Sequence, residues 1–146
     1  MRQYFLLVLL GIVSVAAPTM AGTDTLVVRV TNILRQAGII DVTVYRNDST
    51  FLSDKSWAAN KDVRLDTTFT KGICDITVVL PHDEYALVVF QDINLNGKLD
   101  VNFIGYPNEP FAFSRHFHPR FRAPKFCEIS FQCKHPRDTL VVPLMN

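Results

Sequence analysis

Hydrophobic residues occupy every second position in several short segments of this chain, and this spacing restricts the possible folds more than any other feature. The alternation runs through residues 26–31, 40–45, 74–80, 127–133 and 140–144. Because successive side chains of a β-strand point to opposite faces, each segment is typical of a strand with one buried face. Residues 85–90 are apolar on both faces, which predicts a central strand. About seven strands separated by turn residues predict a single all-β domain of the sandwich class.

One segment between the predicted strands has a weak helical signal. Ser53 can cap a turn or two of helix over residues 53–60. Trp57 lies in this segment, and we expect it to plug one end of the sandwich rather than bind a ligand.

The three cysteines fall on inward-facing strand positions, where thiols behave as small hydrophobic groups. An odd count leaves at least one thiol unpaired. Cys127 and Cys133 would be roughly 20 Å apart on one extended strand, too far for a disulfide. Any bond within the chain should therefore involve Cys74, but we expect all three to be buried free thiols.

The first 21 residues have the pattern of a cleavable signal peptide. Arg2 supplies a positive charge, residues 5–15 are mainly apolar, and small residues precede a cleavage point after about Ala21. The apolar run is shorter than the roughly 20 residues of a transmembrane helix. We therefore expect a signal peptide over residues 1–21, a mature domain over residues 25–146, and a periplasmic or extracellular location.

The charge balance excludes some partners. The whole chain has 15 Lys and Arg against 14 Asp and Glu, so loss of Arg2 leaves the two signs equal. A neutral domain gives no reason to expect nucleic acid or an anionic membrane as partner. No later segment is long and apolar enough to cross a membrane. The expected partner is an unidentified small molecule or protein of the cell envelope.

The segment after the predicted central strand has the spacing of a calcium-binding loop. Residues 92–100 read D-x-N-x-N-G-x-x-D, the first nine positions of an EF-hand-type loop. The expected oxygen donors are the side chains of four residues and one backbone carbonyl: Asp92, Asn94, Asn96, Asp100 and the carbonyl of Lys98. Phe103 stands where the bidentate Glu belongs, so Ca²⁺ would bind weakly unless Glu109 completes the shell. The alternative is a loop held by Asx-turns without metal.

A longer stretch carries a resemblance to a known family. Residues 92–109, followed by Phe113 and Ser114, are similar to the hallmark D-x-N-x-N-G-x-L-D-x-N-x-x-G-x-P-x-E, then G-F-S, of the bacterial family called domain of unknown function 2141. Ala112 and Arg115 depart from that pattern, where Gly and Asn are usual. The resemblance covers about residues 25–146 and implies an exported, prealbumin-like or immunoglobulin-like sandwich. It transfers no catalytic residues.

A basic tract follows the loop, with no acidic residue between Glu109 and Glu128. Its cations and histidines could bind an anion or a sugar acid, and the histidines could hold a metal. They could also form a solvated loop whose Arg stems cover apolar surface. The candidate residues are Arg115, His116, His118, Arg120, Arg122 and Lys125.

These patterns favour a binding function over catalysis. The chain has no G-x-S-x-G nucleophile motif and no closely spaced zinc ligand pair. The leading prediction is an exported binding or accessory domain with a weak calcium loop. The alternatives are a ligand-processing enzyme or anion-binding protein that uses the basic tract, and a structural module of an envelope complex. A deep pocket uniting Glu109 with His116 or His118 would favour the enzyme.

Overall fold

The computed structural model describes residues 22–53, 56–65, 72–119, 122–134 and 137–145. The predicted signal peptide and Arg120 lie outside these residues. The described chain forms strands β1 (Thr23–Thr31), β2 (Ile39–Tyr45), β3 (Ala59–Arg64), β4 (Cys74–Pro81), β5 (Asp83–Asp92), β6 (Phe111–Phe113), β7 (Phe131–Cys133) and β8 (Arg137–Pro143), with one short helix, α1 (Phe126–Ile129). Among these residues no helix is long and apolar enough to cross a membrane.

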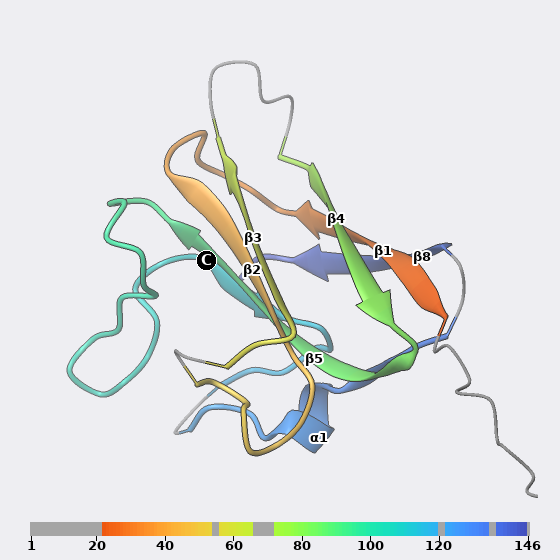
Figure 1. Cartoon of the computed structure of the whole chain (residues 1–146). Coiled ribbons are helices and arrows are strands. Elements are labelled where there is room, and N and C mark those ends of the chain that lie inside the picture. The colour runs from red at the N-terminus through yellow and green to blue at the C-terminus, as the bar shows by residue number, and fades with distance from the viewer. Residues whose placement is uncertain (1–21, 54–55, 66–71, 120–121, 135–136, 146) are drawn as a thin grey trace, which may run out of the picture.

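The strands form two sheets that face each other, as Figure 1 shows. The smaller sheet has the order β4-β1-β8, in which β1 pairs antiparallel with β4 and parallel with β8. The larger sheet has the order β3-β2-β5-β6, and β7 pairs with the first residues of β5. The all-β sandwich predicted from the sequence is confirmed.

The alternation of hydrophobic residues explains why these strands form. In β4 the burial alternates without a break, and the buried positions face β1's buried positions across the antiparallel register. The two inner faces enclose the core, which includes Leu26, Ile40, Leu80 and Leu87. β5 is buried along most of its length because it lies between β2 and β6, as expected of a central strand.

Four expectations about local structure are wrong. Residues 127–133 do not form one strand, because Phe126 and Ile129 are three residues apart and pack together on Ala86 as one face of α1. This turn of helix exposes Cys127, whereas Cys74 and Cys133 are buried; all three thiols are free.

The third correction concerns residues 53–60, whose described part contains no helix and leads directly into β3. Trp57 does not plug the sandwich, since 49% of its surface is exposed.

The connection from β5 to β6 leaves the sandwich as a long loop over residues 93–110 and then returns to the same sheet (Figure 1). The Gln91 N–H donates to the Pro110 carbonyl at 2.8 Å, so the two ends of the loop meet. The predicted calcium loop is the first half of this connection.

Candidate functional site

The loop begins at the buried end of β5. Asp92 is buried and its carboxylate points back into the turn that follows. Its Oδ1 accepts a hydrogen bond from the Asn96 N–H at 3.2 Å, and its Oδ2 accepts one from the Gly97 N–H at 2.7 Å. Gly97 has a φ of 76°, in the left-handed region that favours glycine. The first and sixth positions of the motif are therefore joined directly.

The two asparagines of the motif make the same type of turn. Asn94 Oδ1 accepts a hydrogen bond from the Asn96 N–H at 3.1 Å, and Asn96 Oδ1 accepts one from the Lys98 N–H at 3.0 Å. These are Asx-turns, in which a short side chain satisfies the backbone two residues later. These backbone hydrogen bonds explain why Asn occurs at alternate positions of the motif.

The side chains of three predicted ligands converge. Asp100 accepts a hydrogen bond from Asn94 Nδ2 at 2.6 Å and from Asn96 Nδ2 at 2.9 and 3.0 Å. Asp92, Asn94, Asn96 and Asp100 supply the hard oxygen donors that calcium prefers. In this arrangement, however, the amide nitrogens face Asp100, so a bound cation would replace these amide contacts. No group of three His, Cys, Asp or Glu side chains suited to a metal occurs in the described part of the chain.

Glu109 closes the base of the loop. Its Oε1 accepts a hydrogen bond from the Ile93 N–H at 2.8 Å, and its Oε2 accepts one from the Asp100 N–H at 3.2 Å. The carboxylate therefore connects the backbone on both sides of the motif, nine residues from Asp100 and sixteen from Ile93. In this structure Glu109 is a clamp on the loop backbone, a role that the sequence motif does not indicate.

Part of the basic tract is engaged in contacts around α1. Arg122 donates two hydrogen bonds to the Glu128 carboxylate, each at 2.7 Å, and its guanidinium lies 5.5 Å from the centre of the Phe117 ring. The Lys125 N–H donates to the same carboxylate at 2.7 Å. Arg122, followed by the Lys125 N–H, lowers the pKa of Glu128 from 4.5 to about 2. These contacts agree with the alternative in which the tract is a solvated loop whose Arg stems cover apolar surface.

The rest of the tract lies elsewhere. Arg115 and His116 line a pocket of about 330 Å³ beside the end of β8. The His116 and His118 rings meet edge to face, with centroids 4.3 Å apart. Glu109 lines a different pocket, next to Leu34 and Tyr106, so the structure does not unite it with His116. Arg115 and Arg122 line separate pockets as well.

A groove on the outer face of the larger sheet was not foreseen from the sequence. Its floor is formed by Val88 and Phe90 of β5, with Asp41 and Thr43 of β2 and Asn60 of β3 beside them, and its volume is about 510 Å³. The strand register places Thr43 directly opposite Val88 on one side and Asn60 on the other. The available signal was the alternation itself, because the outward positions of β2 carry these polar side chains.

A hydrogen-bonded cluster fixes the polar side chains of the groove. Thr43 Oγ1 donates to Asp41 Oδ1 at 2.7 Å. Asn60 Nδ2 lies 3.0 Å from Asp41 Oδ2 and 2.8 Å from Thr43 Oγ1. Asn60 is exposed and the other two residues are half-buried, so the cluster is accessible and its orientation is set before any ligand arrives.

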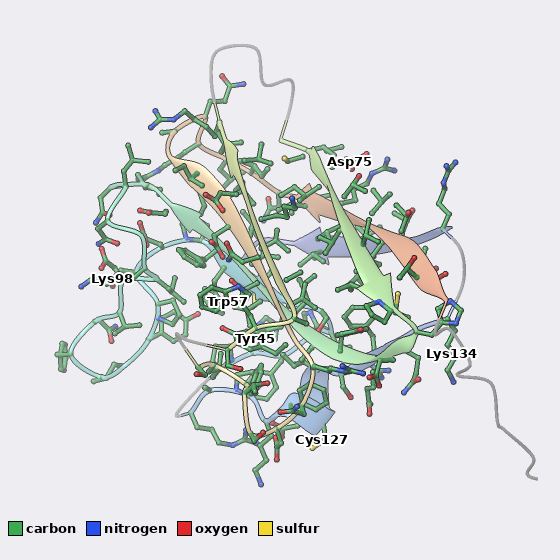
Figure 2. The ribbon with its side chains drawn as sticks, in the orientation of Figure 1. Tyr45, Trp57, Asp75, Lys98, Cys127 and Lys134 are labelled. Atoms are coloured by element: carbon green, nitrogen blue, oxygen red, sulfur yellow. The ribbon has the colours of Figure 1, made fainter. Side chains whose placement is uncertain are left out.

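The groove has walls from two distant parts of the chain. Trp57 and Tyr45 line one part, and the loop residues Gly97, Lys98 and Leu99 line another. In Figure 2 the Trp57 side chain and the loop that carries Lys98 lie on the same side of β3, away from the smaller sheet. The calcium-type loop is therefore also a wall of the groove.

The chain matches one known protein family, in agreement with the hallmark segment and the sandwich fold. The family described as "Uncharacterized protein conserved in bacteria (DUF2141)" matches residues 28–140. The chain belongs to this family. No curated protein and no solved structure is matched by the chain. Membership supports the resemblance seen in residues 92–109 and assigns no ligand or reaction to the DUF2141 chain.

Proposed function

We propose that this DUF2141 protein is an exported binding module whose ligand occupies the groove on the outer face of the larger sheet. The observation that carries the proposal is the partly exposed cluster of Asp41, Thr43 and Asn60, already oriented by hydrogen bonds beside an exposed tryptophan. Ligand sites typically combine apolar and aromatic walls with a few well-placed polar groups. The signal-like residues 1–21 support export, and a mature N-terminus near Gly22 is the expected result of N-terminal sequencing.

The proposal includes a calcium ion in the loop that forms one wall. Asp92, Asn94, Asn96 and Asp100 would supply side-chain oxygens, and Lys98 its carbonyl. Two loop carboxylates and no Glu at the twelfth position predict a dissociation constant on the order of 10⁻⁴ to 10⁻³ M. The ion would fix the position of Gly97, Lys98 and Leu99 against the groove.

Thermal unfolding in calcium or in chelator tests the metal. At a free calcium concentration ten times the dissociation constant, calcium binding to the folded state alone adds about 1.4 kcal/mol to the free energy of unfolding. For a domain of this size the melting temperature should rise by roughly 5 °C, and less in magnesium. Asp100→Asn should abolish the rise. Asp75→Asn is the control, because it removes the same charge from an exposed pair with Arg29 on the other sheet.

Equal melting temperatures of the wild type in calcium and in chelator would remove the metal from the proposal. The loop would then be an Asx-turn scaffold. The groove would be unaffected by that result, since its polar cluster lies on β2 and β3.

Native mass spectrometry tests the groove. The protein is incubated with the small-molecule fraction of a cell-envelope extract, and retained species are identified by mass. Thr43→Arg should block retention by filling the groove floor. Thr77→Arg is the matched control, because Thr77 is exposed on β4 of the smaller sheet. Identical retained species in both variants would refute a ligand site in this groove.

A further inference from the structure

Trp57 is exposed in a way that folding does not explain. Its side chain lines the groove and also a second pocket of about 300 Å³ that includes Arg46, Ser56 and Tyr85. None of the ring pairs among the described residues includes Trp57. An indole ring is a large apolar surface whose face carries negative partial charge. Here that surface contributes little to the core and is open to a ligand.

The polar cluster leaves hydrogen-bonding capacity for a ligand that carries hydroxyl groups. Asp41 Oδ2 accepts one hydrogen bond, from Asn60, and a carboxylate oxygen can accept two. Asn60 Oδ1 has no partner in the described part of the chain, and it is an acceptor. The cluster thus presents adjacent acceptors on a fixed frame. Neighbouring hydroxyl groups on a ring are suited to such a pair.

The charge of the groove favours a ligand without net charge. Among its described lining residues, Asp41 and Lys98 are the only charged side chains, one of each sign. The basic tract does not line this groove; its Arg122 lines the adjoining apolar pocket, where it is paired with Glu128. A strongly anionic or cationic ligand would meet no net opposite charge here.

The shape of the groove favours a ligand longer than a single ring. A second apolar pocket of about 330 Å³ shares Leu52, Val88 and Leu99 with the groove, so the two adjoin. Pockets of about 300–1,000 Å³ are typical for small-molecule ligands.

From these features we infer that the groove binds a neutral oligosaccharide, with one sugar ring stacked on Trp57 and hydroxyl groups hydrogen-bonded to Asp41 and Asn60. This inference rests on the proposed function and names its ligand class. The C–H groups on one face of a pyranose ring carry positive partial charge, which is complementary to the indole face. The hydroxyl groups at the rim of the same ring reach the polar cluster.

Intrinsic fluorescence provides a direct test, because Trp57 is the single tryptophan of the chain. The probes are hexasaccharides of β-1,4-glucose, α-1,4-glucose, β-1,4-mannose, β-1,4-xylose and β-1,4-N-acetylglucosamine, each added up to millimolar concentration. At least one should shift the emission to shorter wavelength with a saturable curve. Calorimetry with the same sugar should show that Trp57→Ala and Asn60→Ala each weaken binding by about tenfold or more. Phe103→Ala should bind normally, since Phe103 is a fully exposed aromatic outside the groove.

Two results would overturn the inference alone. One is the absence of an emission shift or heat of binding with every sugar, while Thr43→Arg still blocks another retained species; the groove would then bind a different ligand class. The other is sugar binding that survives both Trp57→Ala and Asn60→Ala, which would place the sugar site elsewhere. If no species is retained and no sugar binds, both the inference and the proposed groove fail.

Discussion

Removal of the Glu109 carboxylate should release the loop while leaving the sandwich folded. The Ile93 N–H and the Asp100 N–H both donate to this side chain. A hydrogen bond to a charged acceptor contributes roughly 1.5–3 kcal/mol to the free energy of unfolding. In the variant, water can replace part of the hydrogen bond that the Asp100 N–H loses. We therefore expect Glu109→Ala to lower the free energy of unfolding by about 3 kcal/mol. Glu109→Gln keeps one acceptor and should lose about half as much.

Urea denaturation and amide hydrogen exchange measure the two parts of this effect. The slope of the urea transition should stay the same because the core is intact. The amides of Ile93 and Asp100 should exchange faster in both variants, while those of β1 and β4 keep their order of protection. Glu84→Ala is the control: it removes a carboxylate that accepts one hydrogen bond from Ser130, and should cost about 1 kcal/mol.

A Glu109→Ala protein as stable as the wild type, with unchanged exchange at both amides, would refute the clamp. The loop would then be held by the Asx-turns alone. A loss of stability equal to that of Glu84→Ala would lead to the same conclusion.

Three other predictions concern single positions. Gly38→Ala should cost several kcal/mol in urea denaturation, since its Cβ would lie 2.0 Å from a carbonyl oxygen at the start of the loop; Gly105→Ala, with no atom within 4 Å, should cost about 1 kcal/mol of backbone strain. Arg122 lowers the Glu128 pKa to about 2, so this pair stabilises the protein above pH 4.5 and is lost as the pH falls toward 2; Glu128→Gln should flatten that part of the acid denaturation curve. Cys127 should react with a thiol reagent in the folded protein, whereas the two buried cysteines react only after unfolding.

The strands could be predicted from sequence because their signal is local. Period-two alternation found the positions of β1, β2, β4 and β8, and the apolar run of residues 85–90 found β5. The same reasoning failed at residues 127–133, where alternation and helical spacing coexist. Phe126 and Ile129 satisfy the helical spacing, and their burial against Ala86 decides the outcome. Ala86 is forty residues away in sequence, so no local pattern contains this contact.

The candidate site also has one part that local sequence indicates, the loop, and one part that depends on distant contacts, the groove. Residues 92–100 are close in sequence, and the side chains of Asn94, Asn96 and Asp100 come together through hydrogen bonds. The groove joins β2, β3 and β5 with the loop, and only the strand register places Thr43 between Asn60 and Val88. The basic tract shows the converse, because Arg115 and Arg122 belong to one short segment and line separate pockets.

The position of the loop relative to the groove is determined by the interior of the sandwich. Buried Gln91 donates from Nε2 to the Arg35 carbonyl at 2.7 Å and to the Ala37 carbonyl at 2.8 Å, which ties the end of β5 to the connection before β2. Asp92 follows directly, and its carboxylate holds Gly97 in place.

Since Gly97 belongs both to the calcium motif and to the groove wall, a cation and a ligand would act on the same segment. Binding free energies coupled in this way are reciprocal. A sugar bound against Lys98 and Leu99 would therefore tighten the calcium site by the same factor by which calcium tightens sugar binding. Asp100→Asn, which removes a metal ligand but no groove residue, should abolish that coupling and leave calcium-free sugar affinity unchanged.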